Sequence, residues 1–405
     1  MRYSVDDLAA VIDRDYAPRH IVVLRYRNAL RFDDLSADAV RFRTLLQRTS
    51  IAEGLRIFSL GAYRDVQIDI LDETSLMHTG TLKSIDGSVT MAHCLLRRYR
   101  SVVFETGGNT GVALTRYGAR AGIATYCFVP AQNLTLMDGD VFDAPAAHLI
   151  AVEDPRHVKA SARAFAAERG FPRVPEVEWR YHAAMFVGCF LVEHCAERPR
   201  YDYLAQTISA AFGPIGIYRV LREHLGQVGA LPRFLGVQQA SNCAMVRAWR
   251  AAAGPGALDT PAAAPPPAAP LLAKVMYDRE PQTYGTADEF HTILRTTGGN
   301  LETIDQEEFA RALTCHVGGP DLLHGLRANG VEIATVDGEV LEKTGLLGLA
   351  GVFKCVDSGR IQPGTRVLVC LTGGTAQPRR PATPEASIRS GGMQKPTAVE
   401  TETAQ

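Results

Sequence analysis

The chain has 405 residues, of which 46% are hydrophobic and 21% are charged, and its formal net charge at pH 7 is −1. This is enough for two domains with cores of their own, and the near-neutral charge gives no reason to expect nucleic acid or an anionic membrane as a partner. No apolar run approaches the ~20 residues of a membrane helix. The N-terminus shows no basic and then apolar signal region, and the eight cysteines form no Cys-x-x-Cys pair. We therefore expect a reduced, cytoplasmic enzyme without a disulfide framework or a metal site.

The first informative residue along the chain is Lys83. It follows the turn Thr79-Gly80-Thr81 and precedes residues with apolar side chains at helical spacing. The pattern predicts that Lys83 lies where a loop meets a helix. A lysine held at a fixed, buried point loses its proton readily and serves as a covalent nucleophile. Taken alone, Lys83 is better explained as a solvated surface lysine, because lysines are seldom buried.

A unit of strand, helix and strand follows. Residues 102–104 are predicted to form a buried strand, residues 112–121 a helix that ends at Gly122, and residues 123–129 a strand that ends at Pro130. This is the size expected for a βαβ unit of a parallel sheet. Short apolar runs between helices predict an open α/β architecture.

The turn inside this unit reads Thr106-Gly107-Gly108-Asn109-Thr110-Gly111. It links a strand to a helix N-terminus, where free backbone N–H groups and the helix dipole bind anions, and its glycines let an anion approach the backbone. The spacing of a dinucleotide-binding loop is not met. The turn is therefore predicted either to hold a substrate carboxylate or to be a Gly-rich connection without a ligand.

A second unit is predicted from a strand at 207–211, a turn at 212–216, a helix at 218–225 and a strand at 234–238. Gly213 and Gly216 permit close approach, and the N–H groups of Ile215, Gly216 and Ile217 are predicted to hold a phosphate. Pro214 has no N–H, which leaves one donor fewer. A βα turn without a ligand is the alternative.

A late apolar strand at 366–371 runs into Thr372 and two glycines. Ligands of open α/β sheets gather at the carboxyl ends of strands, where the Thr372 hydroxyl either bonds to an aromatic nitrogen or caps the backbone. Two stretches are predicted to lie outside the core, an Ala/Pro-rich surface insertion at 251–270 and a disordered tail at 376–405.

Together and in this order, these elements resemble the pyridoxal phosphate (PLP) enzymes of fold type II, which are tryptophan synthase β-like, and among them most closely threonine synthase. Residues 79–83 are similar to the Thr-Gly-Ser-Phe-Lys segment of the family, and residues 106–111 to its Ser/Thr-x-Gly-Asn-Thr-Gly loop. Further similar segments follow in the family's order at 231–238, at 297–299 with 305–308, and at 369–373. The resemblance spans residues 73 to 374.

The resemblance implies an α/β fold of two open parallel-sheet domains. Residues 1–93 and 190–375 would form the large domain that carries the cofactor, and residues 94–189 a small mobile domain. It also implies a small amino-acid substrate and leaves open whether the chain forms a homodimer.

The resemblance further assigns roles at the site. Lys83 would form the Schiff base with PLP and move the α-proton, Asn109 would bond to the 3′-oxygen of the cofactor, and Thr372 would face the pyridine nitrogen. A neutral hydroxyl there suits elimination and replacement at Cβ or Cγ better than transamination. The substrate carboxylate would bind to Thr106, Gly107, Gly108, Asn109 and Thr110, and the cofactor phosphate to Gly213, Pro214, Ile215, Gly216 and Ile217.

The departures from the family concern the substrate. Ser84 and Ile85 stand where Asp-Arg is usual, and Phe212 and Pro214 stand where relatives have Gly and Asn. Because the arginine after Lys83 is missing, a second phosphate would need other cations, and the candidates are Arg180, His182 and Lys159. Three enzymatic interpretations stay open, namely threonine synthase, cysteate synthase and another β-replacement or elimination enzyme. A non-catalytic binding protein that has kept the fold is the rival, which the retained Lys83 disfavours.

Overall fold

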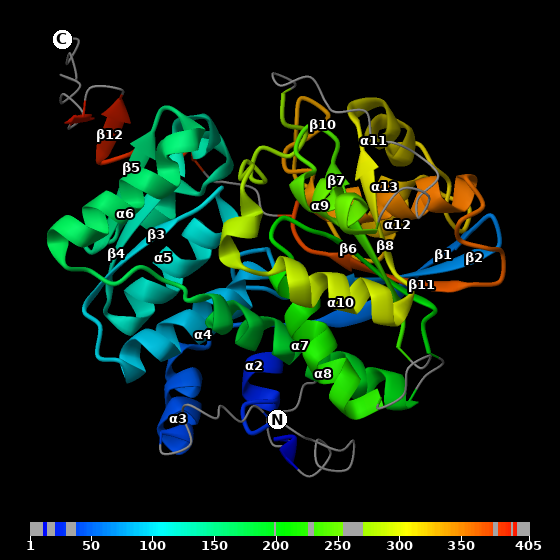
Figure 1. Cartoon of the computed structure of the whole chain (residues 1–405), viewed down its shortest axis with the longest axis horizontal. Coiled ribbons are helices and arrows are strands. Elements are labelled where there is room, and N and C mark those ends of the chain that lie inside the picture. The colour runs from blue at the N-terminus through cyan, green and yellow to red at the C-terminus, as the bar shows by residue number, and fades with distance from the viewer. Residues whose placement is uncertain are drawn as a thin grey trace.

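The computed structural model describes residues 11–13, 21–29, 38–197, 200–225, 231–253, 270–375, 380–389 and 392–394. Within these ranges the chain forms two mainly parallel sheets with helices packed on their faces (Figure 1). This confirms the expected α/β fold with open parallel sheets. In the same ranges, no helix combines the length and the apolar character needed to cross a membrane.

The larger sheet has the strand order β1-β2-β11-β6-β7-β8. β1 is antiparallel to β2, and every other neighbouring pair is parallel. The strands are β1 (Arg56–Tyr63), β2 (Val66–Asp72), β6 (Tyr203–Thr207), β7 (Arg233–Gln239), β8 (Asn300–Ile304) and β11 (Arg366–Leu371). The helices around it are α7 (Val177–Glu197), α8 (Phe212–Leu225), α9 (Ala244–Ala253), α10 (Ala287–Thr297), α11 (Gln306–Leu313), α12 (Leu322–Ala328) and α13 (Thr344–Asp357).

Strand β11 shows why this sheet is closed to water on both faces. Leu368 and Cys370 are buried in the cluster that contains residues of α7, α8 and α10, while Val367 and Val369 are buried in the cluster that contains residues of α13. Successive side chains of a strand point to opposite faces, so a strand covered on both sides is apolar throughout. The unbroken apolar run of 367–371 is the sequence signal of this arrangement.

The smaller sheet has the order β13-β12-β5-β4-β3, with β13 antiparallel and the other strands parallel (Figure 1, left). Its strands are β3 (Ser101–Glu105), β4 (Ala124–Pro130), β5 (Ala147–Val152), β12 (Ala386–Arg389) and β13 (Gly392–Gln394). The helices beside it are α4 (Lys83–Leu96), α5 (Asn109–Ala121) and α6 (Val158–Arg169). The remaining elements are α2 (Val22–Arg25), α3 (Ala39–Thr49), β9 (Thr335–Val336), β10 (Glu339–Val340), and the short helices η2 (Ala131–Leu136), η3 (Gly139–Asp143), η4 (Pro155–His157) and η5 (Pro281–Tyr284).

Two predictions at the periphery are changed by the structure. The predicted disordered tail is wrong for residues 386–389 and 392–394. β12 pairs in parallel with β5, and β13 pairs with β12, so both strands extend the smaller sheet. The predicted insertion begins too early, because residues 251–253 complete helix α9. Residues 254–269 of the insertion, and residues 376–379, 390–391 and 395–405 of the tail, lie outside the described residues.

The second βα unit is shifted relative to its prediction. Strand β6 ends at Thr207, where the sequence predicted that a strand begins, and helix α8 starts at Phe212 rather than at Tyr218. The connection between them is therefore the short loop 208–211. Ala211 in this loop has a positive φ of 61°, a conformation that side chains other than glycine seldom adopt.

Candidate active site

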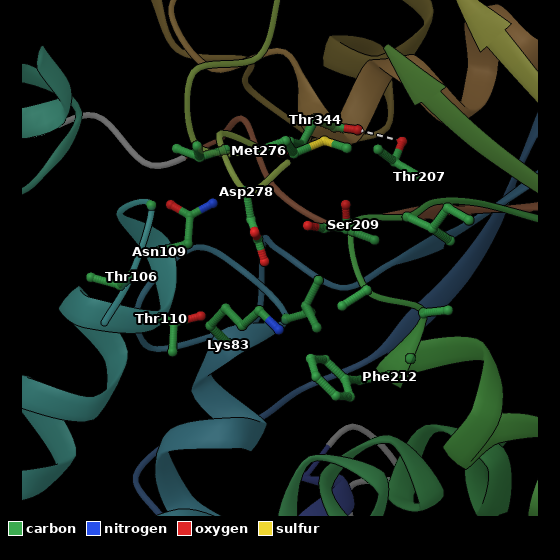
Figure 2. Close-up of a pocket in the computed structure, with 18 of the residues that line it drawn as sticks. Lys83, Thr106, Asn109, Thr110, Thr207, Ser209, Phe212, Met276, Asp278 and Thr344 are labelled. Carbon is green, nitrogen blue, oxygen red and sulfur yellow. Dashed lines mark hydrogen bonds between the residues drawn. The ribbon is translucent and has the colours of Figure 1, made fainter. Parts of the chain in front are cut away.

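A cavity of about 200 Å³ lies where strands of both sheets end. Ligand sites of open α/β sheets occur at the carboxyl ends of strands. Figure 2 shows Lys83 between Asn109 and Thr110 on one side and Ser209 and Phe212 on the other. The predicted site residues that line this cavity are Lys83, Thr106, Gly107, Gly108, Asn109, Thr110, Gly213, Pro214 and Thr372.

Lys83 is the first residue of α4, as predicted. The turn before it is tied to the end of β11, because the N–H of Leu82 donates to the carbonyl of Thr372 at 3.2 Å, and the Thr375 hydroxyl donates to the carbonyl of Gly80 at 2.9 Å. Gly80 has a φ of +67°, which favours glycine. These contacts fix the position of the lysine backbone relative to Thr372.

The loop after β3 is held from three sides. The Thr106 hydroxyl accepts hydrogen bonds from the N–H groups of Gly108 and Gly111 at 2.9 and 3.0 Å. The Asn133 amide donates to the carbonyls of Gly107 and Lys274 at 2.7 and 3.1 Å, so it joins this loop to the segment that follows residue 270. Since the loop leads directly into the N-terminus of α5, its backbone is suited to an anionic group.

Gly107 and Gly108 have separate reasons to be glycine. A β-carbon on Gly107 would lie 1.9 Å from the carbonyl oxygen of Val275, which is shorter than any real contact. Gly108 has a φ of +148°, which strains any other residue. The first glycine permits close packing and the second permits the backbone turn, so both shape the loop that faces Lys83.

The residues predicted to bind the cofactor phosphate, 213–217, lie partly at the cavity and partly away from it. Gly213 and Pro214 line the cavity, whereas Ile215, Gly216 and Ile217 do not. The N–H of Ile215 already donates to the carbonyl of Ala211 at 3.2 Å within the first turn of α8. Gly216 is glycine for another reason, since a β-carbon there would lie 2.5 Å from the Tyr181 carbonyl oxygen of helix α7.

Residues that precede the predicted phosphate-binding segment line the cavity instead. Ser209, Ala210, Ala211 and Phe212 line the cavity together with Gly213. They enter the N-terminus of α8, where backbone N–H groups are not used by the helix itself. Their sequence signal is weak because the positive φ falls on an alanine, and the usual glycine signal of a tight loop is missing.

Gly373, the residue after Thr372, lies beside Glu342 and Asn109. A β-carbon at Gly373 would lie 2.7 Å from a carboxyl oxygen of Glu342 and 3.5 Å from the Asn109 amide nitrogen. Glu342 accepts a hydrogen bond from the N–H of Thr344 at 2.6 Å. Burial raises the pKa of the Glu342 carboxyl, although the hydrogen bonds from Thr344 oppose this effect. The end of β11 thus brings Thr372 close to the start of α5.

The cations predicted to serve the substrate are separated by the structure. Arg180 lines the cavity, its guanidinium lies 4.8 Å from the Phe212 ring centre, and no described carboxylate forms an ion pair with it. Lys159 is bonded to Asp278 at 2.8 Å and does not line the cavity. His182 is buried against His93, with 3.3 Å between ring nitrogens, and lies away from the cavity lining.

Comparisons with known proteins agree with this geometry. Residues 65–314, more than half of the chain, match the family of pyridoxal-phosphate dependent enzymes, and the chain belongs to this family. It is 26% identical over 323 residues to cysteate synthase from Methanosphaerula palustris and 24% identical over 302 residues to threonine synthase from Methanosarcina acetivorans. Each match covers 73% of this chain and 67% of the relative.

Solved structures share the fold at lower identity. Diaminopropionate ammonia lyase from Escherichia coli has a TM-score of 0.60 at 13% identity, over 84% of this chain and 89% of that chain. Threonine deaminase from T.th. has a TM-score of 0.55 at 15% identity, over 93% of this chain and 99% of that chain. The architecture is therefore that of the PLP enzymes of fold type II.

The cavity fits the cofactor of this family. It offers the Lys83 amine, a hydroxyl at Thr372 and the loop 208–213, whose entry into α8 suits a phosphate. A β-carbon at Gly213 would lie 3.0 Å from the side-chain amide of Gln206, so a larger residue would fill this part of the loop. The Gln206 amide oxygen is buried without a hydrogen-bond partner, which leaves a polar atom at the same place.

Proposed function

We propose that this PLP-dependent enzyme catalyses elimination or replacement at the β- or γ-carbon of a small amino acid that carries an anionic leaving group. An O-phosphorylated amino acid is the first choice, and phosphohomoserine is the leading candidate within it. The observation that carries the proposal is the convergence of Lys83, the loop 106–110 and the loop 208–213 on one cavity.

Each part of the cavity has a role in the proposal. PLP bound through Lys83 supplies an electron sink for negative charge at the α-carbon of the amino acid. The Lys83 amine removes the α-proton, and the backbone of residues 106–110 orients the substrate carboxylate. In this proposal Thr372 meets the pyridine nitrogen with a neutral hydroxyl, and residues 209–213, which line the cavity, hold the cofactor phosphate.

Arg180 is the residue that favours an anionic leaving group. It lines the cavity from helix α7, beside Phe212, and no ion pair with a described carboxylate engages its guanidinium. Two carboxylates, those of Glu105 and Asp278, also line the cavity, and both already have cationic partners. Glu105 pairs with Arg173 at 3.2 Å, and Asp278 pairs with Lys159. A phosphate or a similar anion would provide the two acceptors that a guanidinium prefers.

The covalent part of the proposal is tested by borohydride reduction followed by peptide mapping. We expect the cofactor label on Lys83 and on no other lysine, and Lys83→Ala should abolish turnover. Label on another residue would overturn the assignment. Purified protein that takes up PLP but turns over none of the activated amino acids would favour the non-catalytic rival.

The substrate is tested by titration with phosphohomoserine, phosphoserine with sulfite, and acetylserine with a nucleophile, while the visible spectrum and the products are followed. Threonine and inorganic phosphate from phosphohomoserine would support threonine synthase, whereas turnover of phosphoserine or acetylserine would select β-replacement. Arg180→Gln should lower kcat/KM for phosphorylated substrates by about 10- to 100-fold, the worth of a charged hydrogen bond. Arg222→Gln, at a partly exposed arginine on α8 that bonds to Thr296, is the control. An equal loss with uncharged acetylserine would count against a leaving-group role.

A further inference from the structure

Four side chains form a continuous row that ends at Arg180. The Lys159 amine lies 4.6 Å from the centre of the Tyr284 ring. The Tyr284 and Phe212 rings meet edge to face, with 5.2 Å between their centres and 68° between their planes. The Arg180 guanidinium lies 4.8 Å from the centre of the Phe212 ring. Two cations from different helices are therefore joined through one pair of aromatic rings.

The row runs from outside the cavity into its wall. Tyr284, Phe212 and Arg180 line the cavity, whereas Lys159 does not. Phe212 begins α8, and Figure 2 shows its ring at the cavity wall. Tyr284 ends the short helix η5, Arg180 lies on α7, and Lys159 lies on α6. The two rings thus connect a lysine of the predicted small domain to the cavity arginine of the proposed function.

Lys159 fixes the segment that carries the Tyr284 ring. Its amine pairs with Asp278 at 2.8 Å and donates to the Glu280 carbonyl and the Thr283 hydroxyl, each at 3.2 Å. An ammonium group has three N–H donors, and all three have an acceptor here. Because these contacts lie on the residues just before Tyr284, the position of its ring is set relative to α6.

Phe212 is also supported from α7. The Tyr181 ring centre lies 6.1 Å from that of Phe212, and the Arg219 guanidinium lies 4.2 Å from the Tyr181 ring centre. Arg219 also pairs with Glu178, the carboxylate two residues before Arg180 on the same helix. The contacts of Phe212 with Tyr284 and Tyr181 therefore hold its ring between two aromatic neighbours, while Arg219 binds the nearest carboxylate in the sequence of α7.

Stacking on a ring suits a guanidinium that must bind an anion. The planar group is attracted to the aromatic face, and its N–H donors point outward in its own plane, where they can meet a phosphate. A side chain that is already held in place loses less freedom when its ligand binds. The Phe212 ring can orient Arg180 in this way only if the ring itself is held, and Tyr284 is the neighbour that ties it to Lys159.

We propose that Tyr284 is a positioning residue, whose ring carries the anchoring by Lys159 to Phe212 and so holds the Arg180 guanidinium ready for the phosphate of the substrate. This inference rests on the proposed function, in which Arg180 binds an anionic leaving group. The ring of Tyr284 is the part that acts, and its hydroxyl is dispensable.

The first test follows Arg180 directly and needs no turnover. Full-length protein loaded with PLP is treated with phenylglyoxal at increasing concentrations of inorganic phosphate, and peptide mapping gives the modified fraction of Arg180. We expect phosphate to protect Arg180 in the wild type. In Tyr284→Leu, the phosphate concentration for half protection should rise about tenfold, the combined worth of the ring and cation contacts. Tyr284→Phe should keep the protection of the wild type.

Two further variants separate this role from a general loss of structure. Lys159→Met should weaken the protection in the same direction as Tyr284→Leu, and Lys159→Arg should restore it. Tyr203→Leu is the matched control, because the Tyr203 ring carries the Arg233 guanidinium at 5.7 Å but lies at the far end of β6 from the cavity. It should leave the protection unchanged, and urea unfolding shows whether each variant is folded.

The second test is a double-mutant cycle in kcat/KM with the phosphorylated substrate that the titration selects. Tyr284→Leu should lower kcat/KM about tenfold in the wild type and less than about twofold in Arg180→Gln, since two residues that act through one contact are not additive. Protection and kcat/KM that Tyr284→Leu leaves unchanged, or that Tyr284→Phe loses as well, would overturn this inference alone. A wild type in which phosphate gives Arg180 no protection would overturn the leaving-group role of Arg180 in the proposed function, and this inference with it.

Discussion

Substitution of Gly107 by alanine gives a direct test of the loop that faces Lys83. The new β-carbon would lie 1.9 Å from the Val275 carbonyl oxygen and 2.7 Å from its carbonyl carbon. Real β-carbons essentially never approach a neighbour within 3.0 Å, so the loop and the Val275 backbone must separate by at least about 1.1 Å. Neither side can give way by a side-chain rotation, because both contacts are with backbone.

The magnitude follows from this displacement. A shift of about 1 Å in a substrate-positioning group can lower the rate about 100-fold, and forced overpacking costs roughly 1–3 kcal/mol of folding free energy. We expect Gly107→Ala to lose about 100-fold in kcat/KM. PLP binding should remain, because the loop 208–213 comes from a different strand. Steady-state kinetics, with the substrate identified by titration, measure kcat/KM. The visible spectrum reports PLP binding, and urea unfolding gives the free energy of unfolding.

Gly348→Ala is the control for a small residue near the same site. A β-carbon there would meet Val369 at 3.4 Å and Thr207 at 3.5 Å, which are ordinary contacts. Within helix α13, alanine should stabilise the fold by up to about 1 kcal/mol. If Gly107→Ala kept the kcat/KM and the unfolding free energy of the wild type, the reasoning about the packed loop would be refuted.

Four further outcomes are expected. Asn109→Ala should change the visible spectrum of bound PLP and its pH dependence, at a cost of only ~1 kcal/mol in binding, and an unchanged spectrum would contradict the assigned contact. Residues 94–189 should move toward the rest of the chain when substrate binds, and crystal structures with and without substrate that superpose throughout would contradict the movement. Lys159→Met removes the ion pair with Asp278 and should raise amide hydrogen exchange in residues 274–285. Burial, together with the charge of Arg219, lowers the pKa of His182 to about 3, so the unfolded chain binds a proton below about pH 6.5 that the folded chain does not. Stability should therefore fall as pH falls, by about 1.4 kcal/mol per pH unit for this group, and urea unfolding of His182→Gln should show a shallower fall.

Local sequence predicted the structure correctly where a single turn and the element next to it determine the backbone. Lys83 begins a helix after a Thr-Gly-Thr turn, and the loop 106–110 joins a buried strand to a helix N-terminus, as predicted. The turn at 208–211 was misplaced because the apolar residues after Thr207 continue the pattern of a strand, and because the positive φ falls on Ala211. Strand β12 was missed since a strand of a few residues forms only where β5 offers free backbone groups.

The sequence by itself determined the class of fold and the two loops nearest the lysine, because short strands, helix starts and Gly-rich turns depend on neighbours along the chain. It indicated the cofactor through the resemblance of these motifs to a known family. Only the tertiary structure decided which charges meet in the cavity. Arg180 comes from α7, Glu105 ends β3, and Asp278 precedes the short helix η5. Their separation in sequence gives no signal that they line one cavity. The structure also decided that His182 and Lys159 are occupied elsewhere, because ion pairs and burial depend on which elements the sheets bring side by side.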